Sequence, residues 1–237
     1  MPAAFRNVWF AGLPAFFSLI PNSRAMAIPA IRSYPLPTPD SFPQNKVSWA
    51  LQPARAALLV HDMQKYFLRF YEPDSALLKT LIGNIAALKR WAARHDVPVY
   101  YTAQPHQQPA GDRALLNDMW GPGLPAADAA QQAIVPEIAP SAGDVVLDKW
   151  RYSAFQRSDL AERLKAQQRD QLVIVGVYAH IGCMITAVEA FMKDVQPFLV
   201  GDAVADFSEA EHRMALQYVA TRAGVVLATQ DITPATD

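Results

Sequence analysis

Residues that could do chemistry follow three short strand-like segments of the sequence. Asp62 follows the segment 56–60, Gln104 follows 97–103, and Lys149 follows 144–148. Short apolar segments of this kind predict strands that are covered on both faces of a sheet. In open α/β sheets, ligands bind just beyond the carboxyl ends of such strands. We therefore expect an acid, an amide and a cation to share one crevice.

Several of the polar residues have competing interpretations. Asp62 could instead cap the helix that follows it, because Asp is common at helix starts. We interpret His61 and His180 as hydrogen-bonded structural residues, with a supporting role open for His180, and His212 as a solvated helix residue. No pair of His or carboxylate residues has the spacing of metal ligands, so no metal site is expected.

The rest of the chain alternates helix-like and strand-like segments, which predicts a fold of the α/β class. This order implies right-handed crossovers and a three-layer α/β/α sandwich around a mainly parallel, Rossmann-like, six-stranded sheet. Neither a G-x-G-x-x-G motif after the first strand nor a P-loop motif occurs, so no nucleotide cofactor is expected. The helices are expected over 77–94, 159–168, 183–193 and 209–222, and the later strands over 170–176, 196–202 and 224–229.

The proline content divides the chain. The segment 26–53 is rich in proline and lacks periodicity, which predicts an extended arm on the surface of a single domain spanning 54–237. An apolar run over 8–20 resembles a secretion signal, but it is too short to span a bilayer and has a weak basic region. We expect 1–25 to be a disordered extension or an over-long start.

Composition excludes several classes of function. The net charge is −1, with 21 basic and 22 acidic residues, and this balance argues against binding to nucleic acid or to an anionic membrane surface. The single cysteine, Cys183, excludes an intrachain disulfide and makes a structural zinc site improbable. A cytoplasmic location fits this usage.

Several separated motifs carry a resemblance to a known family. They are 61–64 (HDMQ), 101–105 (YTAQP), 120–123 (WGPG), 149–155 (KWRYSAF), 176–183 (GVYAHIGC) and 196–208 (QPFLVGDAVADFS). In this order they resemble the isochorismatases of aryl-siderophore and phenazine pathways, within the isochorismatase-like hydrolase superfamily. The resemblance covers about Met26 to the end of the chain. It implies that Asp202 and Asp206 are structural residues that hold turns.

The resemblance also decides between two kinds of chemistry. The nicotinamidase-type amidohydrolases of the same superfamily use Asp, Lys and a nucleophilic Cys. Counted from Gly176, the family's nucleophile position falls on Gly182, and Cys183 lies one residue later, about 100° around the helix. We therefore interpret Cys183 as a buried apolar residue, and Gly182 as an opening of space for a carbocyclic substrate. A Cys-dependent amidohydrolase remains the alternative.

The reaction implied is the hydrolysis of the vinyl ether of isochorismate to 2,3-dihydroxy-2,3-dihydrobenzoate and pyruvate, in catechol siderophore synthesis, without metal or cofactor. Asp62 would donate a proton to the methylene carbon as a general acid. Burial near Phe67 and Trp120 is expected to raise the pKa of Asp62, and the positive charge of Lys149 is expected to oppose that rise. Lys149 would hold the substrate's carboxylate and hydroxyl groups and orient Asp62.

The substrate is a dianion, so further donors are expected around it. Gln104, Arg113, Tyr178 and the backbone N–H of Gly182 would bind its polar groups, and Trp120 would supply an apolar wall. The alternative substrate is 2-amino-2-deoxyisochorismate, from the phenazine branch. We expect a homodimer and no aryl carrier domain on this chain, with a separate aryl carrier protein as a possible partner. A carrier-protein docking module is the non-enzymatic alternative.

Overall fold

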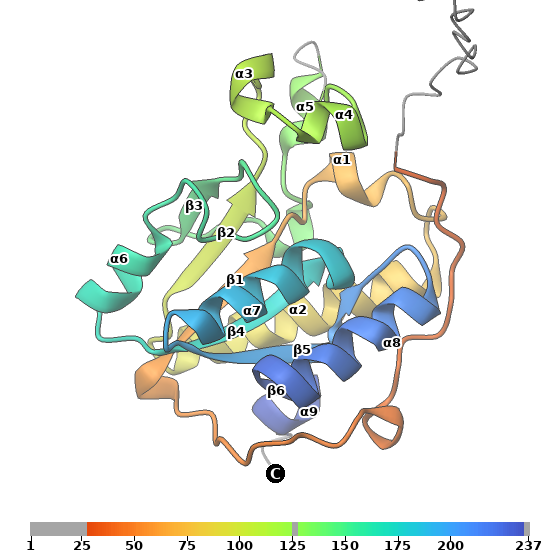
Figure 1. Cartoon of the computed structure of the whole chain (residues 1–237). Coiled ribbons are helices and arrows are strands. Elements are labelled where there is room, and N and C mark those ends of the chain that lie inside the picture. Colours follow the sequence, from red (N-terminus) through yellow and green to blue (C-terminus); the bar gives the residue numbers. More distant parts are fainter. Residues whose placement is uncertain (1–27, 125–127, 235–237) are drawn as a thin grey trace, which may run out of the picture.

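The computed structural model of the chain describes residues 28–124 and 128–234 (Figure 1). The expected extension 1–25 lies outside these residues. Within them, no helix is both long and apolar enough to cross a membrane.

A six-stranded sheet forms the centre of the described part of the chain, and every neighbouring pair of strands in it is parallel. The strand order is β3-β2-β1-β4-β5-β6. The chain adds β2 and β3 on one side of β1 and then β4, β5 and β6 on the other, so the topological switch point lies between β1 and β4. Every residue of β1, β2 and β4 is buried, as expected of central strands covered on both faces. The strands are β1 (Ala56–His61), β2 (Val99–Ala103), β3 (Val145–Asp148), β4 (Gln171–Val177), β5 (Gln196–Ala205) and β6 (Val225–Leu227).

Helices cover both faces of this sheet. Alternate residues of β1 belong to two separate cores: Leu58 and Val60 pack with α2, whereas Leu59 packs with α6, α7 and α8. In Figure 1, α7 and α8 lie in front of the sheet and α2 lies behind it. The predicted α/β/α sandwich is therefore confirmed. The longer helices are α2 (Ala76–Arg94), α6 (Leu160–Ala166), α7 (Met184–Met192) and α8 (Glu209–Tyr218).

Short helices complete the chain. They are α1 (Lys65–Leu68), α3 (Ala110–Arg113), α4 (Leu116–Trp120), α5 (Ala129–Gln132) and α9 (Thr229–Ile232). Short 3-10 turns span Pro39–Ser41, Pro53–Arg55 and Pro136–Ile138, and π-helical turns span Ala179–Cys183 and Val219–Ala223. The long excursion expected between β2 and β3 contains α3, α4 and α5, which lie together beyond the carboxyl ends of the strands (Figure 1).

Helix α2 illustrates how local sequence sets an element. Ser75 caps it, because the Ser75 hydroxyl accepts a hydrogen bond from the backbone N–H of Leu78. Its apolar residues recur every three or four positions and form one buried face, as the spacing predicts. That face contains Leu77, Leu81, Ile85, Leu88, Trp91 and Ala92.

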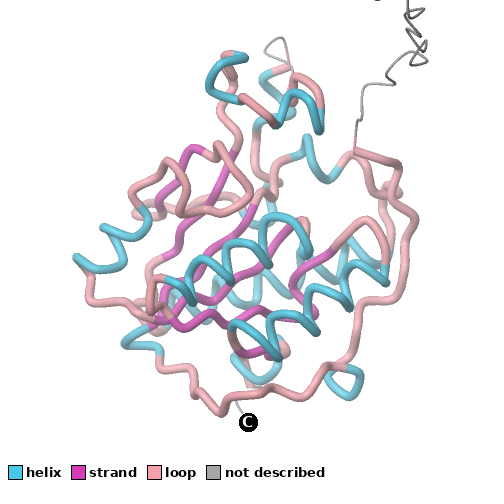
Figure 2. Tube along the Cα trace, in the orientation of Figure 1, coloured by secondary structure: helices cyan, strands magenta, loops and turns pink. Residues whose placement is uncertain are grey.

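The proline-rich segment 28–53 runs along the outside of the molecule mostly as loop (Figure 2). Hydrogen bonds at several points along its length hold it against the domain. The N–H of Ile31 donates to the carbonyl of Phe70, the hydroxyl of Tyr34 contacts His212 on α8, and the side chain of Asn45 exchanges two hydrogen bonds with the backbone of Val226. The arm therefore connects α1, α8 and β6 from outside.

Candidate active site

A cavity lies at the carboxyl ends of the central strands, below the excursion that carries α3 and α4. Its empty volume is about 490 Å³, including its opening to solvent. The eight residues that the sequence predicted for the site all line it: Asp62, Phe67, Gln104, Arg113, Trp120, Lys149, Tyr178 and Gly182. The structure thus brings them together, and their individual roles stay predictions. Residues that the sequence did not single out also line the cavity: Ile28, Tyr66, Leu116, Tyr152, Ile181 and Phe207.

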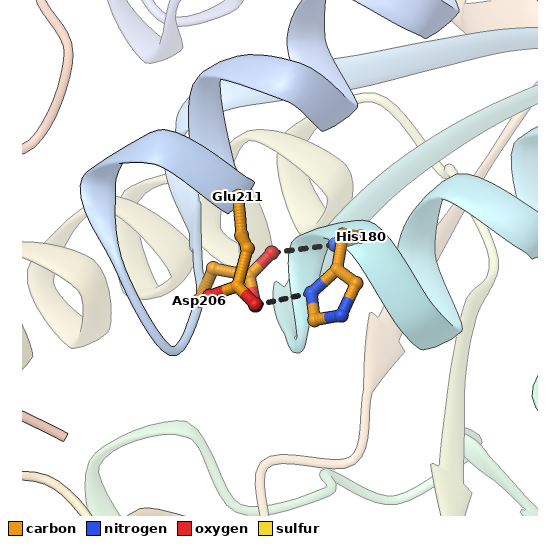
Figure 3. A group of neighbouring side chains, drawn as sticks. All are labelled: His180, Asp206 and Glu211. Carbon is orange, nitrogen blue, oxygen red and sulfur yellow. Dashed lines mark hydrogen bonds and ion pairs between the residues drawn. The ribbon is translucent and has the colours of Figure 1, made fainter.

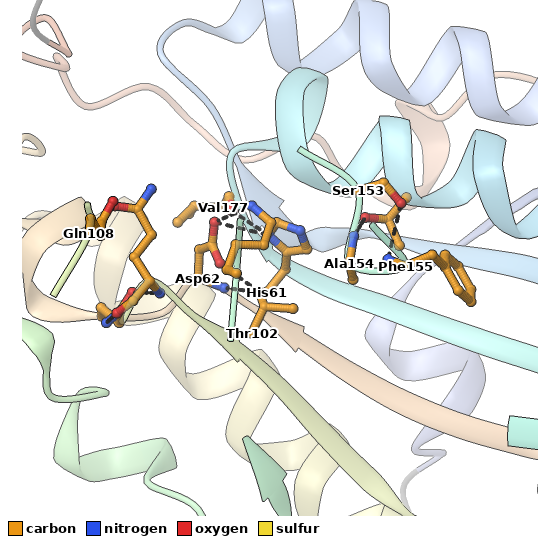
Figure 4. Close-up of polar contacts among 12 residues, drawn as sticks. His61, Asp62, Thr102, Gln108, Ser153, Ala154, Phe155 and Val177 are labelled. Carbon is orange, nitrogen blue, oxygen red and sulfur yellow. Dashed lines mark hydrogen bonds and ion pairs between the residues drawn. The ribbon is translucent and has the colours of Figure 1, made fainter. Parts of the chain in front are cut away.

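Asp62 sits where β1 ends, and both of its carboxylate oxygens accept hydrogen bonds (Figure 4). The Thr102 hydroxyl donates to Oδ1 at 2.6 Å, and Lys149 Nζ donates to Oδ2 at 2.8 Å. The backbone of Asp62 has a φ of 50°, a left-handed conformation that Asp tolerates better than most residues. Gln64, not Asp62, occupies the N-cap position of α1. The capping alternative for Asp62 is therefore wrong.

The register of the sheet explains how Thr102 and Lys149 come to contact Asp62. Strand β2 pairs with β1 so that Thr102 lies opposite His61, and β3 pairs with β2 on its other side. Immediately after β3, the N–H of Lys149 donates to the carbonyl of Ala103 at 2.8 Å. The Lys149 side chain, 7% exposed, can then reach across the end of β2 to Asp62.

The pKa of Asp62 is lowered, not raised. Burial alone would raise it, but the positive charge of Lys149, the neighbouring His61 ring and the hydrogen bonds from Lys149 and Thr102 together outweigh burial. The expectation of a raised pKa is therefore wrong for the free protein, because the hydrogen bond from Thr102 depends on strand register and the direct contact with Lys149 is stronger than strand ends alone indicate. In the free protein Asp62 is a carboxylate near neutral pH.

Arg113 supplies a second buried cation. The whole residue is 4% exposed, its Nε donates to the Gly121 carbonyl at 2.8 Å, and its Nη1 donates to Gln108 Oε1 at 2.7 Å. No carboxylate of the described residues forms an ion pair with it. A buried guanidinium with neutral partners suits the carboxylate of a ligand.

Neutral polar groups also face the cavity. The Gln104 backbone is fixed by the Gln64 side chain, and Gln104 Oε1 accepts from Gln108 Nε2 at 3.2 Å, which leaves the Gln104 amide N–H groups as donors. The Tyr178 hydroxyl donates to the Phe67 carbonyl at 2.8 Å, so its proton is not directed at a ligand. The expected donor role of Tyr178 does not fit this bond.

Tyr152, which the sequence analysis did not single out, is a further polar residue of the cavity. Its hydroxyl accepts a hydrogen bond from Trp120 Nε1 at 2.8 Å and keeps its own proton to donate.

Aromatic rings form the wall opposite the polar groups. The Phe207 ring lies 4.5 Å from that of Tyr178 and 6.0 Å from that of Trp120, measured between centroids. The Phe67 ring packs edge-on against Tyr178 at 6.0 Å. This arrangement offers an apolar surface to a ring-shaped ligand, with charged groups at its edge.

Cys183 lies in the core and does not line the cavity. It is completely buried among the residues that pack α7 against the sheet, and burial raises the pKa of its thiol well above the usual value. The prediction that Cys183 is a buried apolar residue is confirmed.

Gly182 faces the cavity, but a Cβ atom placed there would lie 2.1 Å from Cε1 of His61. The space beside Gly182 is thus filled by an imidazole, and the expectation that it admits substrate is wrong.

A second polar cluster joins the turn after β4 to the end of β5 (Figure 3). His180 Nδ1 donates to Asp206 Oδ1, and the backbone N–H of His180 donates to Asp206 Oδ2, both at 2.6 Å. Glu211 lies beside them, and its candidate ligand atom is within 4.8 Å of theirs. The two Asp206 oxygens already accept hydrogen bonds, so the group fits a structural His–Asp pair better than a metal site. Asp202 also holds a turn, by accepting from the backbone and side chain of Thr229.

The parallel sheet, the cavity at its carboxyl edge and the buried Asp62–Lys149 pair describe an α/β protein with a candidate active site at its strand ends. A family model described as the Isochorismatase domain matches residues 56–231. The chain belongs to the isochorismatase family.

Curated relatives and solved structures agree with this assignment. Enterobactin synthase component B of Escherichia coli is 56% identical over 210 residues, which cover 89% of this chain and 73% of that protein. Phenazine biosynthesis protein PhzD1 of Pseudomonas aeruginosa is 52% identical over 205 residues, which cover 86% of this chain and 98% of that protein. A crystal structure of a cysteine hydrolase from Pseudomonas syringae pv. phaseolicola has a TM-score of 0.72 at 25% identity, and the match covers 85% of this chain and 96% of that one.

Proposed function

We propose that the protein hydrolyses the vinyl ether of isochorismate to 2,3-dihydroxy-2,3-dihydrobenzoate and pyruvate. The observation that carries the proposal is a buried carboxyl group, Asp62, that lines a cavity together with two buried cations, Lys149 and Arg113. No thiol accompanies it, since Cys183 lies in the core. A site of this kind suits proton transfer rather than attack by a nucleophile on a carbonyl. The match to the Isochorismatase domain, and the relatives named for enterobactin synthesis and phenazine biosynthesis, support the same reaction.

The cavity offers complementary groups for a dianion. Arg113 and Lys149 would each hold a carboxylate, Gln104 and Tyr152 would donate to hydroxyl or carboxylate oxygens, and the carbocycle would lie against the aromatic wall. The carboxylate held by Lys149 would be the one on the enolpyruvyl group. The methylene carbon of this group must receive the proton. Holding it near Lys149 would bring that carbon close to Asp62, which is 2.8 Å from the same Nζ atom.

Substrate binding also supplies the proton donor. The free carboxylate of Asp62 owes its lowered pKa chiefly to Lys149, which outweighs the opposing effect of burial. A bound carboxylate shares the charge of Lys149, adds negative charge near Asp62 and displaces water, and all three changes raise the pKa of Asp62. The carboxyl group then transfers its proton to the methylene carbon. Water captures the resulting oxocarbenium ion, returns a proton to Asp62, and the hemiketal collapses to pyruvate and the ring alcohol.

A second substrate, 2-amino-2-deoxyisochorismate, is favoured by one specific observation. The Pseudomonas aeruginosa relative named for phenazine biosynthesis is matched over 98% of its length at 52% identity, close to the 56% of the Escherichia coli relative. The two substrates differ in one ring substituent and require the same proton transfer. We give isochorismate precedence, with catechol siderophore synthesis as the pathway. We also propose a cytoplasmic homodimer that works with a separate aryl carrier protein.

One assay tests both substrates. Purified protein is mixed with isochorismate or with its 2-amino analogue, and pyruvate is measured with a coupled dehydrogenase. We expect a higher kcat/KM with isochorismate. Higher kcat/KM with the amino analogue would assign the phenazine-type substrate, and no pyruvate from either compound would refute the proposed reaction.

A further inference from the structure

His61 is completely buried next to Asp62, does not line the cavity, and has no part in the reaction proposed above. Two glycines surround it. Gly176 lies opposite it in the sheet with a φ of +111°, and a Cβ atom there would lie 2.1 Å from the His61 carbonyl oxygen. A Cβ atom on Gly182 would lie 2.1, 2.7 and 2.8 Å from three atoms of the His61 ring. One glycine therefore accommodates the backbone of His61, and the other accommodates its side chain.

Gly182 has no conformational need to be glycine. It lies inside the π-helical turn Ala179–Cys183 that leads into α7, outside the left-handed region of φ. Glycine in a helix is less favourable than alanine, because its backbone loses more freedom on folding. The structural reason for glycine at this position is thus the imidazole beside it.

The imidazole cannot move away easily. Its Nδ1–H donates to the Val177 carbonyl at 3.0 Å, and Figure 4 shows the ring between that backbone and Asp62. Nδ1 also lies 3.5 Å from Asp62 Oδ2. Non-bonded carbon atoms pack at about 3.5–4.0 Å, so a side chain on residue 182 requires the ring to shift by more than an ångström in a closed interior.

We propose that His61 determines the reaction class of this site, because its imidazole occupies the volume that a nucleophilic side chain at position 182 needs. The proposal rests on the proposed function, in which Asp62 protonates carbon and no thiol takes part. His61 and Gly182 then form a matched pair: with His61 in place, position 182 admits no side chain, and Asp62 is left as the reactive group. Conversion to a thiol-dependent site requires both positions to change.

Burial supports this assignment by keeping the ring uncharged. It lowers the pKa of His61 to about 4, against the opposing effects of the Asp62 charge and of the hydrogen bond to the Val177 carbonyl. A neutral ring fills space beside Asp62 without adding another cation to the one on Lys149.

A double-mutant cycle on thermal stability tests the steric coupling. Gly182→Ala is expected to lower Tm by about 3–10 °C, the range for overpacking in a domain of this size. In a His61→Val background the same change should shift Tm by less than about 2 °C, because the smaller side chain leaves room for the new methyl group. Gly83→Ala is the matched control, since a Cβ there meets nothing within 4 Å on helix α2. Equal Tm losses in both backgrounds would overturn the proposal.

Protein solubility keeps the cycle informative if one variant fails to fold. Insoluble Gly182→Ala that becomes soluble when His61→Val is added supports the coupling as directly as a Tm difference. Equal insolubility of Gly182→Ala with and without His61→Val, while His61→Val alone folds, contradicts it.

Thiol chemistry tests the functional half of the proposal. In a Cys183→Ala background, Gly182→Cys combined with His61→Val should give a thiol that reacts with iodoacetamide at least tenfold faster than Gly182→Cys with His61 retained. The Gly182→Ala variant should lose pyruvate release from isochorismate. Adding His61→Val should restore part of that activity, mainly by raising kcat and less by lowering KM. Equal labelling rates would show that His61 does not exclude a reactive side chain. The Tm cycle and labelling use no substrate, so they can succeed or fail independently of the proposed isochorismate reaction.

Discussion

The Asp62 carboxyl group accepts hydrogen bonds on both oxygens, from Thr102 and from Lys149. At the scale of single residues, its chemistry depends on these two partners as much as on burial. An amide in its place keeps the shape of the site and can still bond Thr102, but it has no acidic proton. This makes Asp62→Asn a substitution that separates chemistry from binding.

We expect Asp62→Asn to lower kcat for pyruvate release by about 10²–10⁴-fold, the usual contribution of a positioned general acid. The KM should change much less, because Arg113 and Lys149 remain to hold the substrate. Steady-state kinetics with isochorismate provide the measurement, and Asp148→Asn, an exposed neighbour of Lys149, provides the control. Turnover within threefold of the wild type would exclude Asp62 as the proton donor.

Binding of a dianion should raise the pKa of Asp62 and draw a proton from solvent. A lowered pKa in the free protein means that Asp62 is ionised near neutral pH, so protonation in the complex requires net uptake. Calorimetry with an unreactive dicarboxylate analogue, in buffers of different ionisation enthalpy, should show uptake approaching one proton at pH 7. The uptake should disappear in Asp62→Asn, and its persistence there would place the proton elsewhere.

At the scale of elements, the excursion between β2 and β3 positions Arg113. Two glycines after helix α4 have positive φ, +69° at Gly121 and +77° at Gly123. The Gly121 carbonyl accepts from Arg113 Nε, but only at Gly123 would a Cβ atom meet the guanidinium. A Cβ on Gly123 would lie 2.6 Å from Arg113 Cζ, whereas a Cβ on Gly121 meets nothing within 4 Å. Comparing alanine substitutions at the two glycines therefore distinguishes the effect of backbone strain from the effect of displacing Arg113.

We expect Gly123→Ala to raise KM about tenfold or more while kcat falls less, because a hydrogen bond to a charged group contributes about 1.5–3 kcal/mol. Gly121→Ala also places a side chain at a positive φ, but without the clash and with the Gly121 carbonyl kept for Arg113 Nε, so it should leave KM within about threefold. Kinetics of pyruvate release for the two variants provide the measurement. A similar rise of KM in both would attribute the effect to strain in the loop.

The local pattern of the sequence predicts the strand ends well, whereas Arg113 and Trp120 of the excursion follow only from the family resemblance, and there is a physical reason for the difference. Asp62, Gln104 and Lys149 each follow a strand, and parallel strands deliver their ends to one edge, so local pattern was enough to bring them together. Gln108 and Tyr152 lie in irregular segments, whose side-chain directions depend on contacts distant in the sequence. No periodic signal could have identified them.

Long-range contacts also explain why the expectation for His212 on helix α8 is wrong. His212 was expected to be solvated, yet it is fully buried in α8. The Tyr34 hydroxyl of the arm donates to its Nδ1 at 3.1 Å, and its Nε2 donates to the Gly201 carbonyl at 2.9 Å. Neighbouring charges on α8 suggested an exposed face, and the arm that covers this position carries no periodicity from which its path could be inferred.

At the scale of the whole molecule, two buried histidines make stability depend on pH. Burial lowers the pKa of His61 and of His212 to about 4, from an ordinary value of 6.5. Between these values the unfolded chain binds protons that the folded protein does not, so the free energy of unfolding falls as pH falls through this window. His180 acts oppositely: its pKa is raised, since its bond to Asp206 outweighs burial, and its contribution is lost as pH rises.

We therefore expect the free energy of unfolding to fall by about 2 kcal/mol for each of the two buried histidines between pH 7 and pH 5. Guanidinium titrations at the two pH values measure it. His212→Asn, which cannot ionise, should be less stable than the wild type at pH 7, because the Tyr34 and Gly201 bonds are disturbed, but should lose about 2 kcal/mol less between pH 7 and pH 5. His95→Asn, at the exposed end of α2, serves as the control for replacing a histidine by asparagine. An unchanged pH dependence in His212→Asn would mean that this histidine has the same pKa in the folded and unfolded states, and that the arm does not hold it neutral.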